Sequence, residues 1–118
     1  MHRRFLWNTL VLLSLAGVSV GCSRAQVVCD LICECQHCSD QDEIMICARY
    51  STLEDEADAY GCSDAWTAYT ICIEEKGTCD ETTLEFSIRD NGGNRCSKEG
   101  RGLLDCIDAA SAHGGFDF

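Results

Sequence analysis

The sequence predicts a mainly α-helical domain: a small, disulfide-stapled bundle of about four helices with one extended segment near residues 82–90. Two observations carry this prediction. Apolar residues recur at steps of three and four in several segments, which is the spacing of one face of an α-helix. Cysteine accounts for 11 of the 118 residues, a fraction typical of short secreted chains that are built on disulfides. A chain of this length forms one domain at most.

The first 21 residues have the features of an export signal. Arg3 and Arg4 precede a mostly apolar run, residues 5–20, which ends in small residues. This run contains polar side chains and is shorter than the roughly 20 residues that span a bilayer, which argues against a membrane-spanning anchor. We therefore expect the segment to be removed and the rest of the chain to be exported.

Cys22 follows this signal directly. Gly21-Cys22-Ser23 resembles the end of a bacterial lipoprotein signal, in which the cysteine is lipidated and becomes the mature N-terminus. That family prefers Leu at the third position before the cysteine, where this chain has Ser19. Ordinary cleavage would instead leave a secreted or periplasmic soluble protein with a free Cys22. Cysteine parity favours lipidation, because setting Cys22 aside leaves ten cysteines that can pair completely. The resemblance further implies the bacterial outer membrane or cell surface, since Ser23 follows the cysteine.

The chain then divides into four parts: a signal peptide at 1–21, a lipidated N-terminus with a short tether at 22–28, a disulfide-rich helical domain at 29–112, and a C-terminal tail at 113–118.

The first two helices are predicted at about 26–36 and 40–60. Ser39 and Asp40 offer N-cap oxygens for the second helix, with Glu43 completing a capping box three residues after Asp40. Gly61 is well placed to end it. Their apolar faces comprise Val28, Leu31, Ile32 and Cys35 in the first helix, and Ile46, Tyr50, Leu53, Ala57 and Tyr60 in the second.

Two further helices are predicted at about 63–76 and 97–112. Ser63 or Asp64 can cap the third, and Gly77 stops it. Ser97 can cap the fourth, which ends before His113. Their faces comprise Cys62, Trp66, Tyr69, Cys72, Ile73 and Lys76 in the third helix, and Leu103, Cys106, Ile107 and Ala110 in the fourth.

Between these helices, residues 84–89 alternate apolar and polar with period two, as a half-buried strand does. No obvious partner strand follows from the sequence. The terminal Phe116-Asp117-Phe118 could pair with it, but a lone extended loop that packs Leu84, Phe86 and Ile88 on the core is the favoured interpretation. Residues 91–94 form a turn.

The cysteines after Cys22 are all disulfide candidates, because export places them in an oxidising compartment. Cys62 and Cys72 are separated by nine residues, and so are Cys96 and Cys106. Antiparallel helices could place Cys72 beside Cys96 and Cys62 beside Cys106. A bridge from Cys79 to Cys96, with Cys62 and Cys72 reaching N-terminal cysteines, fits the spacing equally well. The ten candidates are Cys29, Cys33, Cys35, Cys38, Cys47, Cys62, Cys72, Cys79, Cys96 and Cys106.

The paired spacing resembles the twin C-x9-C helical hairpin of the coiled-coil-helix family of the mitochondrial intermembrane space. The similarity covers residues 62–106. The long gap between the pairs, the additional Cys79 and the bacterial-type signal depart from that family. The resemblance therefore implies only two helices stapled together.

Metal binding is the main chemical alternative to disulfides. Cys29, Cys33, Cys35, His37 and Cys38 gather thiols and an imidazole in ten residues, and these ligands suit zinc or copper. Their spacing is not that of a structural zinc site, which shows two separated ligand pairs. Cys35 and Cys38 also form a C-x-x-C redox motif, but no βαβ pattern surrounds it. Structural disulfides are therefore the favoured interpretation, with no metal and no other cofactor.

The composition limits the possible partners. Acidic residues number 20 against 9 basic ones, a net charge of −11, so the chain lacks the basic surface that binds nucleic acid. No catalytic motif is present, and we expect no enzymatic activity. The chain resembles the small cysteine-rich predicted lipoproteins of myxobacteria in Cys22, the cysteine cluster at 29–38 and the acidic second helix.

The sequence therefore predicts a lipid-anchored structural or interaction module of the cell envelope. Its partners would be the membrane, through the lipid, and an envelope or extracellular protein. The alternative is an exported thiol-based redox or metal-binding protein that uses the cluster from Cys29 to Cys38.

Overall fold

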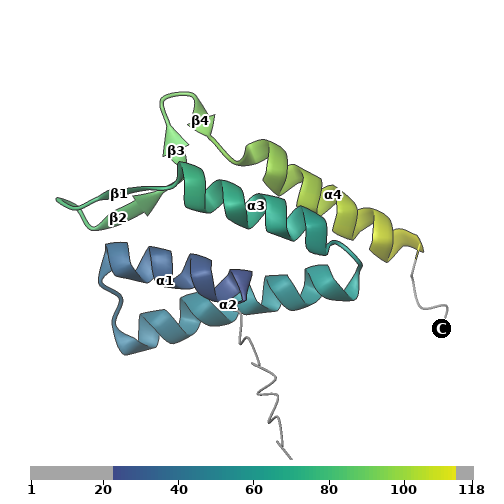
Figure 1. Ribbon diagram of the computed structural model, residues 1–118, viewed down its shortest axis with the longest axis horizontal. Helices are drawn as coiled ribbons and strands as arrows, with labels where there is room; N and C mark the ends of the chain where they lie inside the picture. Colours follow the sequence, from purple (N-terminus) through teal and green to yellow (C-terminus); the bar gives the residue numbers. More distant parts are fainter. Residues whose placement is uncertain (1–22, 114–118) are drawn as a thin grey trace, which may run out of the picture.

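The computed structural model describes residues 23–113, and this part of the chain contains four helices and two short β-hairpins (Figure 1). The predicted mainly α, disulfide-stapled fold is confirmed. The signal at 1–21, Cys22 and residues 114–118 of the predicted tail lie outside the described residues. The elements are α1 (Arg24–Gln36), α2 (Asp40–Ala59), α3 (Ser63–Lys76), β1 (Thr78–Asp80), β2 (Glu85–Ser87), β3 (Arg89–Asp90), β4 (Gly93–Asn94) and α4 (Ser97–His113).

The helices form two antiparallel pairs that pack on one another. α1 runs against α2, and α3 runs against α4, while α3 lies between α4 and the first pair (Figure 1). Both hairpins lie in the connection between α3 and α4. None of the helices between Ser23 and His113 is long and apolar enough to cross a membrane.

α1 begins earlier than the sequence pattern predicts. Ser23 is its N-cap and accepts a hydrogen bond from the Gln26 N–H at 3.1 Å. Ala25 and Val28 are buried, so residues 24–28 belong to the folded domain and do not form the expected tether. Arg24 adds to this attachment, because its Nε donates to the Thr70 hydroxyl of α3 at 3.1 Å. The domain therefore starts immediately after Cys22.

The connection from α2 to α3 is a Schellman motif, in which backbone N–H groups satisfy the last helix carbonyls. Cys62 N–H donates to Ala57 O at 2.7 Å, and Gly61 N–H donates to Asp58 O at 3.2 Å. Gly61 has a φ of 70°, a left-handed conformation that favours glycine, so the predicted helix stop is confirmed. The short turn makes Cys62 the N-cap of α3.

The predicted caps are confirmed only in part. Of the two candidates for α2, Ser39 is the cap and accepts from the Asp42 N–H at 3.2 Å, while Asp40 is the first helical residue. Ser63 and Asp64 do not cap α3, because both already lie inside the helix, and the Ser63 hydroxyl donates to the Asp58 carboxylate at 2.5 Å. Ser97 does not cap α4, because it is already the first residue of that helix. α4 also extends one residue further than predicted and includes His113. In each case the correction moves a helix boundary by only one or two residues.

The extended segment is a strand with a partner, so the prediction of a lone loop is wrong. β2 pairs antiparallel with β1, and Cys79 lies opposite Phe86. The sequence pattern did not predict β1, because its three residues are all exposed and do not alternate between buried and exposed positions. Phe86 and Ile88 pack on the core as predicted, but Leu84 is 42% exposed at the hairpin tip and does not enter the core. A β-carbon on Gly77 would collide with the Phe86 ring, so this glycine allows the hairpin to fold back onto α3.

The buried side chains form two clusters, and α3 contributes to both. Trp66 lies in the first cluster and Ile73 in the second, each 2% exposed. Gly100 of α4 lies beside the Tyr69 ring, where a β-carbon would make an ordinary contact of 3.4 Å with Tyr69 Cε2. The first cluster contains Ala25, Ala57, Cys62, Trp66, Leu103 and Ile107, and the second contains Val28, Ile32, Cys72, Ile73 and Cys96.

Glu54 of α2 joins three helices through one carboxylate oxygen. Its Oε2 accepts the backbone N–H of Ala25, in the first turn of α1, at 2.8 Å. The same atom accepts the indole N–H of Trp66, in α3, at 2.8 Å. Both donors belong to buried residues, and a buried donor without an acceptor is destabilising.

We expect Glu54→Ala to lower the free energy of unfolding by about 3 kcal/mol, because it leaves two buried donors unpaired. Glu54→Gln should cost about 1 kcal/mol, since its amide oxygen can accept both bonds without the charge. Urea unfolding without reductant measures both changes. The control is Glu56→Ala, an exposed change on the same helix that should stay within about 0.5 kcal/mol. Equal losses in all three variants would contradict this role of Glu54.

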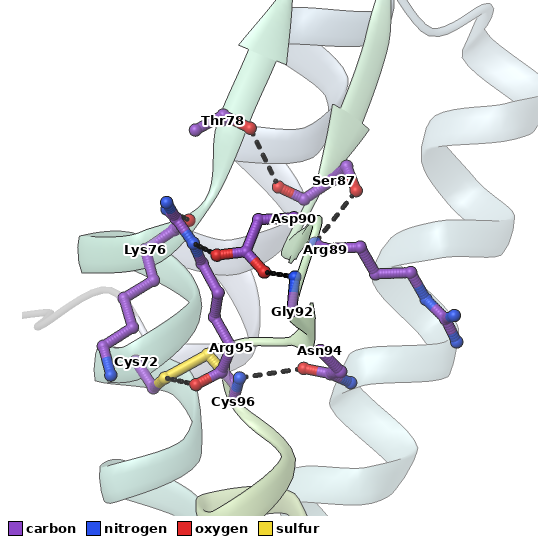
Figure 2. Close-up of polar contacts among 10 residues, drawn as sticks. All are labelled: Cys72, Lys76, Thr78, Ser87, Arg89, Asp90, Gly92, Asn94, Arg95 and Cys96. Carbon is purple, nitrogen blue, oxygen red and sulfur yellow. Dashed lines mark hydrogen bonds and ion pairs between the residues drawn. A yellow bond between two sulfur atoms is a disulfide. The ribbon is translucent and has the colours of Figure 1, made fainter.

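The β3–β4 hairpin is fastened to the end of α3 by Arg95 (Figure 2). The Arg95 Nε donates to the Asp90 carboxylate at 2.8 Å, and its Nη1 donates to the Lys76 carbonyl at 3.2 Å. A cation at the carboxyl end of a helix is favoured by the helix dipole. Asp90 also accepts the Gly92 N–H at 2.8 Å. The Arg95 and Gly92 donors hold the pKa of the Asp90 carboxyl below its ordinary value of 3.8.

This shift predicts how the turn responds to acid. The pKa of Asp90 is lower in the folded state, so its carboxylate stabilises the turn above pH 3.8, and this contribution is lost as the pH falls through the folded pKa. The chemical shift of the Gly92 amide proton should report a titration with a midpoint below 3.8. Asp90→Asn should abolish that titration. A midpoint at or above the ordinary value would contradict the assigned contacts.

Candidate functional site

The ten cysteines of the described part of the chain form five disulfides, which confirms the predicted framework. Their Cα–Cα distances range from 4.9 to 6.0 Å, within the usual span of a disulfide. The bridges are Cys29–Cys47, Cys33–Cys38, Cys35–Cys79, Cys62–Cys106 and Cys72–Cys96.

Of the two arrangements that the nine-residue spacing allowed, the structure has the antiparallel one. Cys62–Cys106 and Cys72–Cys96 staple α3 to α4 near both ends. Cys79 does not bond to Cys96, because β1 turns away from α4 and carries Cys79 to α1. The structure therefore decides a connectivity that the spacing left open.

The carboxyl end of α1 is locked by a local bridge. His37 adopts the left-handed conformation, with a φ of 51°, and its N–H donates to Cys33 O. Cys38 N–H also donates to Cys33 O, at 3.3 Å. An apolar contact often spans these two positions at a helix end, and here the Cys33–Cys38 disulfide spans them covalently. The helix end is thereby held in a fixed shape.

The residues proposed as an alternative metal or redox cluster lie close in sequence but go to different partners. Cys29 bonds to Cys47 of α2, and Cys35 bonds to Cys79 of β1. Cys33 bonds to Cys38, two residues beyond the end of α1. Cys35 and Cys38 are not bonded to each other, so the C-x-x-C motif is not a disulfide. Their sulfurs are not thiolates in this state. Among residues 23–113, no three His, Cys, Asp or Glu side chains are placed to hold a metal ion.

Beside this cluster lies a groove between the carboxyl-terminal half of α1 and the β1–β2 hairpin. Its volume is about 520 Å³. The Cys35–Cys79 disulfide joins its two walls. We call it the α1–hairpin groove. It is lined by Leu31, Glu34, Cys35 and His37 on the α1 side, and by Cys79, Glu81 and Leu84 on the hairpin side.

The lining of this groove combines aliphatic and acidic side chains. Leu31 and Leu84 supply aliphatic surface, while the exposed Glu34 and Glu81 supply carboxylates. Neither carboxylate takes part in a hydrogen bond or ion pair with another described residue. By contrast, Glu74 pairs with Arg24, and Asp90 pairs with Arg95. The groove thus presents two carboxylates that are free to bind.

Two residues that line this groove have a strained backbone conformation. His37 and Leu84 are the two non-glycine residues with positive φ between Ser23 and His113, at 51° and 55°. This conformation costs a non-glycine residue roughly 1–2 kcal/mol. The strain at His37 is held by the Cys33–Cys38 bridge, and Leu84 forms the hairpin turn.

Sequence reasoning missed this groove. Leu84 was assigned to the core, and Glu34 and Glu81 lay in no recognisable motif. No signal in the sequence could have found it, because the groove depends on the Cys35–Cys79 bridge, which joins residues 44 positions apart.

Comparison with known proteins adds no family to this description: no family model, no curated protein and no solved structure matches the chain.

The bridges should differ in their effect on stability. Cys33→Ala/Cys38→Ala opens a loop of roughly 5 residues and should cost about 2 kcal/mol in loop-closure entropy. Cys62→Ala/Cys106→Ala opens a loop of roughly 20 residues while Cys72–Cys96 stays closed, and should cost about 3 kcal/mol. Cys62 is also buried, so its truncation adds a cavity. Urea unfolding of the two variants measures the difference, and a larger loss from the local bridge would refute this ranking.

Proposed function

We propose that the mature chain is a lipid-anchored structural or interaction module of the bacterial cell envelope, without enzymatic activity. One observation carries the proposal. The five disulfides use ten of the eleven cysteines, and the eleventh, Cys22, stands at the end of the lipoprotein-type signal. Disulfides in this number belong to an oxidising, extracytoplasmic compartment, which agrees with export.

The start of the domain supports a rigid attachment. Ser23 caps α1, and Arg24 and Ala25 already contact α2 and α3. A lipid on Cys22 would therefore hold the first turn of α1 close to the membrane surface, with no tether between them. Acyl chains anchor by about 0.8 kcal/mol per buried CH₂, and several together hold firmly.

The charge supports a protein partner over contact with lipid headgroups. Removal of the signal takes Arg3 and Arg4 away and leaves 20 acidic against 7 basic residues. Two of those bases, Arg24 and Arg95, are already paired with carboxylates. Such a surface is repelled by anionic headgroups, so attachment depends on the lipid and recognition depends on the acidic domain.

A thiol-based redox function is the second candidate, and the solvent accessibility of two disulfides favours it. Cys79 is exposed, and Cys33 and Cys38 are half-buried, so the bridges Cys35–Cys79 and Cys33–Cys38 are open to attack by an external thiolate. This candidate requires those two bridges to exchange at the potential of the periplasm, while the buried ones stay closed.

Intact mass of the full chain expressed in a bacterium tests the proposal. The membrane-extracted protein should begin at Cys22, carry diacylglycerol and an acyl chain, and gain ten hydrogens on reduction of its five bridges. Cys22→Ser should lose the lipid mass and leave the membrane fraction, while it keeps the ten hydrogens. An unmodified Cys22 would refute the anchor. A fraction isolated with Cys33–Cys38 or Cys35–Cys79 already reduced would favour the redox function.

A further inference from the structure

We propose that the α1–hairpin groove binds an arginine or lysine side chain of a basic segment in a protein partner. This inference rests on the proposed function as an interaction module and names the chemistry of its partner. The groove unites three features that suit such a side chain: aliphatic walls, free carboxylates and the carboxyl end of a helix.

The walls match the stem of the side chain. Arginine and lysine bury their aliphatic stems along apolar surface and keep the charged head in a polar environment. Leu31 on α1 and Leu84 on the hairpin supply that apolar surface on opposite sides of the groove. The volume of about 520 Å³ falls in the range of protein sites that take small ligands, and is ample for one long side chain.

The carboxylates match its head. Glu34 and Glu81 come from the two walls and have no basic partner among the described residues. Hydrogen bonds between a guanidinium or ammonium group and a carboxylate are about twice as strong as neutral ones. Because neither carboxylate is paired with a basic residue of the described chain, a ligand gains these bonds without first breaking an internal ion pair.

The end of α1 adds a third attraction for a cation. The groove includes His37, the residue that terminates α1. A helix carries partial negative charge at its carboxyl end, and a basic residue in the last turn usually offsets it. α1 has no basic residue in its last turn, whereas α3 ends with Lys76 and the Arg95 contact. A ligand cation in the groove would supply the missing charge.

The groove is also held in shape before any partner arrives. Cys35–Cys79 joins its walls and Cys33–Cys38 locks the end of α1. Binding to a preformed site avoids the loss of conformational entropy that ordering a loop requires. The acidic surface around it would draw a basic segment toward the groove and raise the rate of association.

Binding of hexa-arginine to the oxidised Cys22→Ser protein, measured by calorimetry in about 0.15 M salt, tests the inference. Glu34→Gln/Glu81→Gln should weaken binding about tenfold, because it removes two charge-assisted contacts. The matched control is Asp105→Asn/Asp108→Asn, which removes the same charge from exposed positions on α4 and should change affinity less than about twofold. Intact mass and circular dichroism establish that each variant keeps its five bridges and its helices.

Equal losses in the two double variants would overturn the inference, since attraction would then follow net charge alone. Absence of hexa-arginine binding would also overturn it, and the proposed function would survive if Cys22 is found lipidated. Groove-specific binding by the Cys22→Ser protein, together with an unmodified Cys22 in the intact mass of the full chain, would support the inference and refute the anchor. Shifts of the Leu31 and Leu84 methyl resonances on titration with hexa-arginine would place the peptide in the groove, and methyl shifts confined to α4 would overturn that placement.

Discussion

The stapling of α3 to α4 by Cys62–Cys106 and Cys72–Cys96 is the constraint on which the rest of this structure depends. A domain this small buries a smaller share of its surface than a larger one does, so cross-links add to the stability that its core provides. Of the thirteen buried hydrophobic residues in the described chain, five are cysteines in disulfides, so the bridges are much of the core. α3 supplies Trp66 to one buried cluster and Ile73 to the other. Fixing α3 therefore positions both clusters, and the α1–α2 pair packs against them.

The remaining bridges carry this rigidity outward to the candidate site. Cys29–Cys47 ties α1 to α2, and Cys35–Cys79 ties α1 to the hairpin that leaves α3. The α1–hairpin groove lies where the second of these bridges meets the end of α1. Its carboxylates lie on surfaces that cannot move apart without breaking a covalent bond. The structural disulfides and the proposed recognition surface thus depend on the same connectivity, and the proposed role of this region does not require free thiols.

Local sequence patterns predicted the helices well because a helix is a local structure. The stripe along α2 and the stop at Gly61 depend on neighbours within a few residues. The stop is where the pattern placed it, and the stripe packs on the core except at Tyr60, the exposed C-cap residue. The errors larger than a shifted helix boundary occurred where a contact with a distant part of the chain decides the outcome. Residues 24–28 were expected to be a tether, yet Glu54 and Thr70 draw them into the fold. Leu84 was expected in the core, but pairing of β2 with β1 places it at an exposed turn.

What the sequence by itself determined is the helical content, the approximate ends of the helices, and a cysteine count that leaves Cys22 over when the others pair. Periodicity and parity suffice for these because neither requires knowledge of which residues meet in space. Only the tertiary structure decided which cysteines bond, that Thr78–Asp80 is the partner of the predicted strand, and that Glu34 and Glu81 share one groove. The Cys35–Cys79 bridge, the strand pairing and the groove depend on the direction in which the chain leaves α3 at Gly77, where the Phe86 ring lies against the backbone. A contact between segments far apart in the chain leaves no periodic trace in either segment, and for that reason the groove emerged from the fold alone.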